Sequence, residues 1–281
     1  MKTLILTGSL LLAGMTLASA TVVTNNQTAT TLANTIAGAG ITISNDTLTG
    51  AGAQNGTYVG GAVEAQGNAL LSTGIVLSSG NATTLNNNTN TSNNSSLNTN
   101  LGGDANLNSL IPGYSTFDAA TLEFDFVASG TGTVTGSFWY VFGSEEYNEF
   151  VGSKYNDVFG FFLDGVNIAN IPSTTTPVAI NTVNNTSNSA YYNNNQPGPF
   201  ATEMDGFTKP LSASFTVAGG STHHMKLAIA DAGDHILDSW VLIGGESFTN
   251  QPPSTVPEPS TLAMLAIGVG GLIFARRRLT A

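Results

Sequence analysis

Acidic side chains are concentrated in two short stretches of the sequence. The acidic and amide residues of these stretches are Glu145, Glu146, Asn156 and Asp157 in the first, and Asp231, Asp234 and Asp238 in the second. Crowded carboxylates repel one another unless a cation joins them or they take up protons. Calcium binds about six to eight oxygen ligands, which separate loops often supply together. If the two stretches lie at one end of the fold, their side chains form a cage of oxygens. We therefore predict calcium as a cofactor, bound by the six carboxylates.

Two alternatives to a metal site remain open for these carboxylates. The spacing matches no EF-hand, so the two stretches could be solvated loops that cap the neighbouring strands. A glycoside hydrolase could instead use a pair such as Glu145 and Asp231, since such pairs stand about 5 Å apart in retaining enzymes. Sugar clefts usually expose tryptophan, however, and Trp139 and Trp240 both lie in strand-like stretches typical of a core. We therefore expect no catalytic residue and no enzymatic activity.

The charge of the chain excludes several classes of partner. Between residues 21 and 255 there are 17 acidic residues against three lysines, a formal charge of −14, and no arginine. Binding of nucleic acid needs clustered Lys and Arg side chains that neutralise phosphates. A nucleic-acid partner is therefore excluded, and an anionic lipid surface is an equally poor partner. The chain has no cysteine, which excludes disulfides, thiol catalysis and zinc–thiolate sites.

The N-terminus has the pattern of a secretory signal peptide over residues 1–20. Lys2 precedes an apolar run from 4 to 17, and the small residues Ala18 and Ala20 follow. A positive start, a short apolar middle and a small-residue cleavage site are the three parts of such a signal. We predict that signal peptidase, a partner during export, recognises the two alanines and releases the mature chain.

A second targeting segment lies at the C-terminus, within residues 251–281. Its parts are Pro257, Glu258 and Pro259, then an apolar segment that predicts a transmembrane helix over about 260–275, and then Arg276, Arg277 and Arg278. A spanning helix needs about 20 residues, and arginines keep their end of it cytoplasmic, so the preceding domain lies outside. These parts in this order closely resemble the PEP-CTERM sorting signal of Gram-negative bacteria. The resemblance implies a second partner, the membrane protease exosortase, which removes the tail. A plain membrane anchor would leave the Pro-Glu-Pro sequence unexplained.

Most of the chain between these two segments has the pattern of short β-strands. Residues 121–127 alternate apolar with acidic side chains, as in a half-buried strand, and residues 158–163 form an unbroken apolar run typical of a buried strand. Leu32 and Ile36 stand at helical spacing and predict one short helix near the N-terminus. We predict one domain over residues 21–250, an all-β fold in the form of a jelly-roll-like β-sandwich.

Two features of the connections are also predicted. Residues 129–132 are a glycine-rich turn between the strand at 121–127 and a second strand at 134–142, so we expect these strands to pair as a hairpin. Residues 81–100 and 184–200 are mostly Asn, Ser, Thr and other polar or turn-forming residues. The first of these stretches buries too little apolar surface to offset the cost of ordering it, so we expect a long exposed loop.

The stretch around the first acidic group carries a more specific resemblance. Residues 142–151 read FGSEEYNEFV, and the sequences NDVFGFFL at 156–163 and LAIAD at 227–231 follow. Together with shorter matches at 180–184 and 236–239, they resemble the choice-of-anchor L domain, which bacterial surface proteins combine with different C-terminal anchors. The resemblance covers nearly the whole chain between the two targeting segments. It implies surface display but no defined activity, so it transfers no catalytic residue.

Composition, targeting segments and resemblance together predict an exported, non-enzymatic protein of the cell surface or extracellular matrix of a Gram-negative bacterium. We expect its C-terminal helix to hold it in the inner membrane until exosortase acts. We expect the released protein to serve in adhesion or matrix assembly, with extracellular polysaccharide as its partner. A carbohydrate-binding module is the main alternative, and a secreted glycoside hydrolase is a weaker one.

Overall fold

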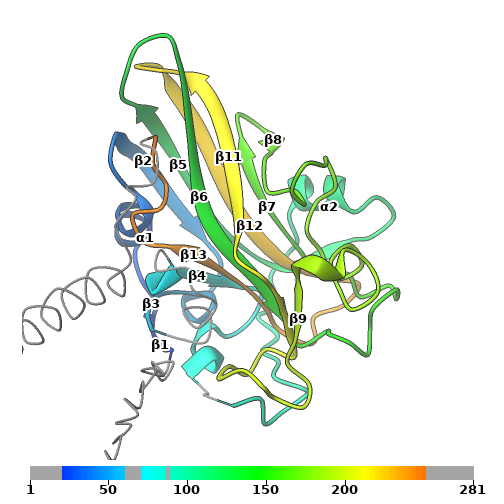
Figure 1. The fold of residues 1–281 in the computed structure, drawn as a ribbon. Helices are drawn as coiled ribbons and strands as arrows, with labels where there is room; N and C mark the ends of the chain where they lie inside the picture. Colours follow the sequence, from blue (N-terminus) through cyan, green and yellow to red (C-terminus); the bar gives the residue numbers. More distant parts are fainter. Residues whose placement is uncertain (1–20, 61–70, 87–88, 251–281) are drawn as a thin grey trace, which may run out of the picture. The chain divides into compact units, whose positions relative to one another are not determined.

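The computed structural model describes residues 21–60, 71–86 and 89–250, and these form two antiparallel β-sheets (Figure 1). The larger sheet has the order β1 (Val22–Asn25), β3 (Asn55–Val59), β4 (Thr73–Ser78), β13 (Ser239–Gly244), β6 (Thr133–Ser144), β10 (Gly206–Thr208) and β9 (Tyr192–Asn194), and β11 (Leu211–Ala218) also pairs with β6. The smaller sheet has the order β2 (Ile41–Thr49), β5 (Thr116–Ala128), β12 (Thr222–Ala232), β7 (Val158–Leu163) and β8 (Val166–Asn167). The helices of the described residues are α1 (Ala29–Ile36), α2 (Ala105–Leu110) and the 3₁₀ turns η1 (Gly52–Gln54), η4 (Ala82–Asn86) and η5 (Ser189–Tyr191).

The two sheets pack face to face through aromatic side chains. Phe138 and Tyr140 of β6 belong to the same core as Phe159 and Phe161 of β7. The ring centroids of Phe138 and Phe161 lie 4.8 Å apart, and those of Tyr140 and Phe159 lie 5.0 Å apart. All four side chains are at most 2% exposed. Full burial of one such side chain stabilises a fold by about 1.5–3 kcal/mol, so these contacts hold the sandwich together.

The unbroken apolar run of β7 is explained by a second layer on its outer face. Phe162 belongs to a separate apolar cluster with Leu107 and Leu110 of α2. This helix begins at Asp104, whose carboxylate accepts hydrogen bonds from the backbone N–H groups of Asn106 (2.9 Å) and Leu107 (3.0 Å). Because α2 covers this side of the strand, β7 is buried on both faces, and the strand predicted from its sequence is confirmed.

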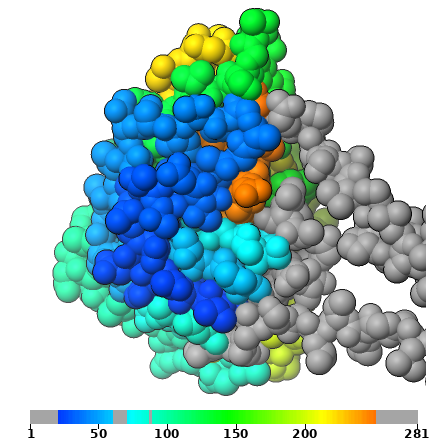
Figure 2. Space-filling model, turned by 90° about the vertical axis from the view of Figure 1, so that its left-hand side faces the viewer, coloured from blue at the N-terminus to red at the C-terminus, as the bar shows by residue number. Residues whose placement is uncertain are grey.

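The predicted N-terminal helix is α1. It begins after Thr28, whose side-chain oxygen accepts a hydrogen bond from the backbone N–H of Thr31 (3.1 Å). It ends at Ile36, because the next residue, Ala37, has an extended backbone (φ −64°, ψ 119°). Figure 2 shows the N-terminal elements in blue over one face of the molecule, with the last described residues in orange beside them. The backbone N–H of Gly38 donates to the carbonyl of Phe248 there (2.8 Å).

β5 and β6 do not form the hairpin that their sequence predicted. β5 pairs with β2 and β12 in the smaller sheet, whereas β6 pairs with β10, β11 and β13 in the larger sheet. The turn between them therefore crosses from one sheet to the other. Phe126 of β5 and Phe138 of β6 both contact the ring of Phe248, at 4.9 and 5.5 Å between centroids. Two apolar strand faces bury each other when they are stacked across a core, and this stacking replaces the hairpin.

The predicted all-β fold with a short N-terminal helix is confirmed, and the compact unit ends at Asn250. The signal peptide predicted at 1–20, the sorting motif and the transmembrane helix predicted at about 260–275 lie outside the described residues. Of the helices that the structure describes, none is both long enough and apolar enough to span a membrane.

Candidate functional site

The two acidic stretches of the sequence meet at one end of the sandwich. The first follows β6 and leads into β7, and the second connects β12 to β13. The backbone N–H of Glu145 donates to the carbonyl of Asp238 (3.1 Å). The N–H of Asn156 likewise donates to the carbonyl of Ala232 at the end of β12 (3.3 Å). The convergence on which the calcium prediction depended is therefore present.

At this end of the fold the predicted ligands divide into two groups. Cluster 1 consists of Glu146, Asp157, Asp231 and Asp234. Cluster 2 consists of Glu145 together with Glu203 and Asp205, which precede β10 and were not predicted as ligands from the sequence. The division shows in the charges that act on each side chain, since Glu145 is influenced by Asp205 and Glu203, but Glu146 by Asp157 and Asp234. The consecutive residues Glu145 and Glu146 thus have different neighbours.

Three of the four side chains of cluster 1 are buried and Asp234 is half-buried, and within the described residues two oxygen atoms of the cluster lack a hydrogen-bond partner. Asp157 accepts hydrogen bonds from the backbone N–H of Ala232 (2.9 Å) and from the hydroxyl of Ser239 (2.7 Å). Within the described residues, however, neither Oδ1 of Asp231 nor Oε2 of Glu146 has a partner. The three carboxyl groups are only 1–2% exposed. A buried polar group without a partner costs about 1–3 kcal/mol, and more when it is charged, so this arrangement favours an additional positive group.

Burial and mutual repulsion raise the pKa values of three carboxyl groups of cluster 1, those of Glu146, Asp157 and Asp231. Burial, followed by the charges of Asp157 and Asp234, raises the pKa of Glu146 to about 9. Burial raises the pKa of Asp157 to about 7, although its two hydrogen bonds oppose the change. Burial and the charge of Asp157 raise the pKa of Asp231 well above its usual range. At neutral pH, Glu146 therefore holds a proton unless a cation replaces it.

Asp238 acts on both clusters and also anchors the low-complexity segment 81–100. Its charge raises the pKa values of Glu145 in cluster 2 and of Asp157 in cluster 1. Its Oδ1 accepts a hydrogen bond from the backbone N–H of Leu97 and its Oδ2 accepts one from that of Asn81, each at 2.7 Å. Apart from η4, the described part of 81–100 is a long and largely exposed loop, as predicted, but buried carboxylates hold its backbone in place.

Two known sequence families match the chain. The sequence profile of the choice-of-anchor L domain matches residues 21–249. The chain belongs to the choice-of-anchor L domain family. A second profile, that of the PEP-CTERM protein-sorting motif, matches residues 255–278. This choice-of-anchor L protein is thus an exported cell-surface protein that exosortase processes, and both resemblances found in the sequence are confirmed. Neither a curated protein nor a solved structure matches the chain.

The acidic residues of the choice-of-anchor L domain do not form a closed metal shell by themselves. In residues 21–60, 71–86 and 89–250, no group of three or more acidic or histidine side chains is arranged to hold a metal ion. Carboxylates that repel one another stand further apart without a cation than around one. Calcium also takes backbone carbonyl and amide oxygens into its shell. An ion at cluster 1 would therefore draw the side chains inward and complete its shell from the surrounding loops.

The two carboxylates considered for a glycoside hydrolase are both buried in the choice-of-anchor L domain. Glu145 and Asp231 lie in different clusters, and each is only 1% exposed. Trp240 is buried, and its indole N–H donates to the carbonyl of Asn81 (3.0 Å). Trp139 is partly buried against the apolar cluster that contains Trp240. Neither tryptophan forms an exposed platform for a sugar ring.

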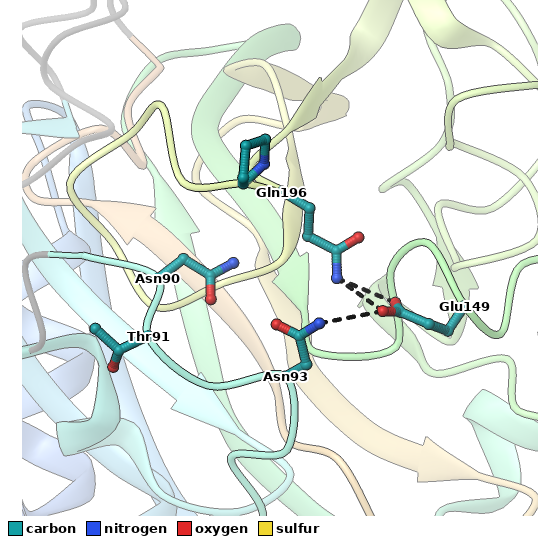
Figure 3. A pocket seen from close by; sticks show the side chains of 6 residues that line it. Asn90, Thr91, Asn93, Glu149 and Gln196 are labelled. Atoms are coloured by element: carbon teal, nitrogen blue, oxygen red, sulfur yellow. Dashed lines mark hydrogen bonds between the residues drawn. The ribbon is translucent and has the colours of Figure 1, made fainter.

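A polar surface pocket lies beside cluster 2. It has a volume of about 490 Å³ and is lined by Asn90, Thr91, Asn93, Glu149, Gln196 and Pro197 (Figure 3). Figure 3 shows the amides of Gln196 and Asn93 directed at the carboxylate of Glu149, at 3.0 and 3.2 Å from its Oε1. Asn90 and Thr91 hydrogen-bond to cluster 2. The sequence did not reveal the pocket, because its walls come from three segments that are distant in the chain, around residues 90–93, 149 and 196–197.

Proposed function

We propose that this protein serves in adhesion or matrix assembly at the surface of a Gram-negative bacterium, without catalysis, and that calcium bound at cluster 1 stabilises its domain. Extracellular polysaccharide is the proposed partner. Signal peptidase removes the leader, and the C-terminal segment holds the protein in the inner membrane until exosortase acts. Export and exosortase processing follow from the sorting motif, whereas the remaining steps are proposals.

The observation that carries the calcium proposal is the pair of buried, unpaired oxygens of Glu146 and Asp231. Protons can neutralise these groups at neutral pH, but a divalent cation can do so while also joining loops from both sheets. Calcium sites in extracellular modules have dissociation constants of about 10⁻⁴–10⁻³ M. At 10 mM calcium, one such site stabilises a domain by about 1.4–2.7 kcal/mol. That is a useful part of the roughly 5–15 kcal/mol that holds a typical domain folded.

Burial of the carboxyl groups supports a role without catalysis. A hydrolase needs two carboxyl groups that reach the glycosidic bond together. Glu145 and Asp231 are both closed off from solvent, and they belong to separate clusters. The acidic residues are better suited to holding the strand ends together than to contacting a substrate.

One observation favours a carbohydrate-binding module as the second candidate function. The pocket beside cluster 2 has a size within the usual range for small ligands, about 300–1,000 Å³, and its walls carry amides, a hydroxyl and a carboxylate. Such groups can donate hydrogen bonds to sugar hydroxyls and accept bonds from them. Among the residues that line it there is no aromatic ring, so recognition would depend on hydrogen bonds.

The calcium proposal can be tested on the domain over residues 21–250, because all three apolar cores lie within it. Isothermal titration with calcium chloride and thermal denaturation with and without EDTA should show binding and a higher melting temperature. Asp231→Asn should remove the heat of one site. Glu246→Gln changes an exposed acidic residue and should leave the titration unchanged. No heat and no change in melting temperature at 10 mM calcium would refute the proposal.

The proposed role can be tested with purified matrix polysaccharide from a bacterium that encodes exosortase. Co-sedimentation of the domain with the polysaccharide, without release of reducing ends, would support adhesion or matrix assembly. Release of reducing ends would instead identify a hydrolase. If the polysaccharide does not bind and a strain lacking the protein builds an unchanged matrix, the proposed role is wrong.

A further inference from the structure

Cluster 2 is as deeply buried as cluster 1 and is equally short of partners. Glu145 is 1% exposed, and Glu203 and Asp205 are fully buried. Oε1 of Glu145 and Oδ2 of Asp205 make no hydrogen bond within the described part of the chain. The amide of Gln196 lies close enough to lower the pKa of Asp205, but its hydrogen bonds go to Glu149. Two buried carboxyl oxygens, contributed by different loops, are thus left for another ligand.

The segment that covers cluster 2 offers only weak compensation. The amide of Asn90 donates to Oδ1 of Asp205 (2.5 Å), and the backbone N–H of Ser95 donates to Oε2 of Glu145 (3.1 Å). Glu203 has three contacts with Thr91 and Ser95, all between 3.3 and 3.5 Å. Hydrogen bonds in proteins are usually about 2.7–3.2 Å long, so the bonds to Glu203 are weak. Neutral donors alone do not balance three buried acidic groups.

In the part of the chain that the structure describes, no basic side chain neutralises cluster 2. In residues 21–250 the only basic residues besides histidine are Lys154, Lys209 and Lys226. The ammonium group of Lys226 pairs with the carboxylate of Asp104 (2.5 Å), which is not part of cluster 2. Lys154 lies over the ring of Tyr155. Within the described residues, no salt bridge involves a carboxylate of cluster 2.

We propose that Glu145, Glu203 and Asp205 form a second divalent-cation site, suited to calcium, that fastens the 90–95 segment to the end of the sandwich. The ligands are hard carboxylate oxygens with amide and hydroxyl oxygens close by, which is the chemistry that calcium prefers. The site uses none of the carboxylates of cluster 1, so it can be occupied whether or not cluster 1 binds an ion.

The second site would also control the wall of the polar pocket. Asn90 and Thr91 contact Asp205 and Glu203, and they also line the pocket (Figure 3). A cation that holds the three carboxylates in place fixes the covering segment and therefore the position of this wall. Removal of the cation allows the carboxylates to separate and the wall to move with them.

The number of bound ions tests the proposal directly. Native mass spectrometry of the domain over residues 21–250 in calcium acetate should show two calcium ions per chain. Glu203→Gln and Asp205→Asn should each lose the ion of cluster 2 and keep the ion of cluster 1. Asp231→Asn should lose the ion of cluster 1 and keep the ion of cluster 2. Glu149→Gln is the matched control, because Glu149 lines the same pocket but is exposed, and this variant should keep two ions. Loss of an ion only in Asp231→Asn would refute the second site while leaving cluster 1 intact.

Hydrogen–deuterium exchange of the wild-type domain gives a second test that needs no substitution. Calcium should slow exchange of the backbone N–H groups of Thr91 and Ser95, which bond to Glu203 and Glu145, by tenfold or more. Glu203→Gln should lose this protection, while Asp231→Asn keeps it. If exchange in residues 90–95 of the wild-type domain does not change with calcium, the proposal is wrong, even if calcium binds elsewhere.

Discussion

Replacing Glu146 with glutamine should stabilise the calcium-free domain at neutral pH and reduce its response to calcium. Glu146 is 2% exposed, and its Oε2 has no partner in the described residues. Glutamine has nearly the same shape as a protonated glutamate but cannot ionise. The substitution therefore separates the cost of burying an acid from the benefit of having a ligand for a cation.

The sign of the effect follows from the raised pKa. Burial and neighbouring charges raise the pKa of Glu146 from 4.5 to about 9. Below pH 4.5 the carboxyl group is protonated in both states, so its contribution to stability is fully present. As the pH rises towards 9, the unfolded chain ionises but the folded one does not, and the free energy of unfolding falls by about 1.4 kcal/mol per pH unit. At pH 7.5 this loss reaches about 4 kcal/mol, and the glutamine variant avoids it.

The assay is urea denaturation of both domains in EDTA at pH 5 and pH 7.5, and again at pH 7.5 with 10 mM calcium. Without calcium, the variant should exceed the wild type by roughly 2–4 kcal/mol at pH 7.5, and by less than about 1 kcal/mol at pH 5. Calcium should narrow the difference at pH 7.5 by about 1.4–2.7 kcal/mol, because the variant lacks one ligand of cluster 1. Glu246→Gln, at an exposed position, serves as the control. A variant that is less stable than the wild type in EDTA at pH 7.5 would refute the reasoning.

Four further predictions concern the core, a helix cap, an anchor and the tail. Phe161→Ala removes a fully buried ring from between the sheets and should lower the free energy of unfolding by about 3–5 kcal/mol in urea denaturation; a loss below 1 kcal/mol would contradict the packing. Thr28→Ala should lower the free energy of unfolding by about 1 kcal/mol in urea denaturation. Thr28→Asn, whose side chain can still cap α1, should lower it little. Asp238→Asn keeps only one acceptor oxygen for the two backbone N–H groups that the carboxylate now binds. Hydrogen–deuterium exchange of the backbone N–H of Asn81 or Leu97 should therefore accelerate. Unchanged exchange at both residues would show that Asp238 does not anchor the segment. Alanine at 257–259, within the sorting motif, should leave the tail on the exported chain, as intact-mass measurement can show.

The strands and the first group of carboxylates were within reach of the sequence because their signals are local. The period-2 pattern of β5 and the continuous apolar run of β7 identify these strands without knowledge of their partners. Glu145 and Glu146 stood out because they are adjacent in an aromatic-rich stretch. Their assignment to different clusters depends on which distant loops lie on each side, and no local pattern contains that information.

The features that the sequence did not reveal all depend on contacts between distant segments. Glu203 and Asp205 lie two positions apart and far from Glu145 in the sequence, and only the fold brings them to Glu145. The composition of residues 81–100 correctly indicated a lack of apolar surface, but order there comes from Asp238 and Asp118, which accept hydrogen bonds from its backbone. The β5–β6 hairpin failed for a similar reason, because a glycine-rich turn does not specify whether the chain stays in one sheet or crosses to the other.

The positions of the three lysines have a consequence for survival outside the cell. A trypsin-like protease cleaves after lysine or arginine, and the domain over residues 21–250 has no arginine. Lys226 lies within β12 and its side chain is only 14% exposed, while Lys209 precedes Pro210, a bond that such proteases do not cut. Of the three lysines, only Lys154 is both exposed and followed by a residue other than proline. It lies in the loop between Glu146 and Asp157, so the same cation that would bind cluster 1 would also shield the one accessible cleavage point from digestion.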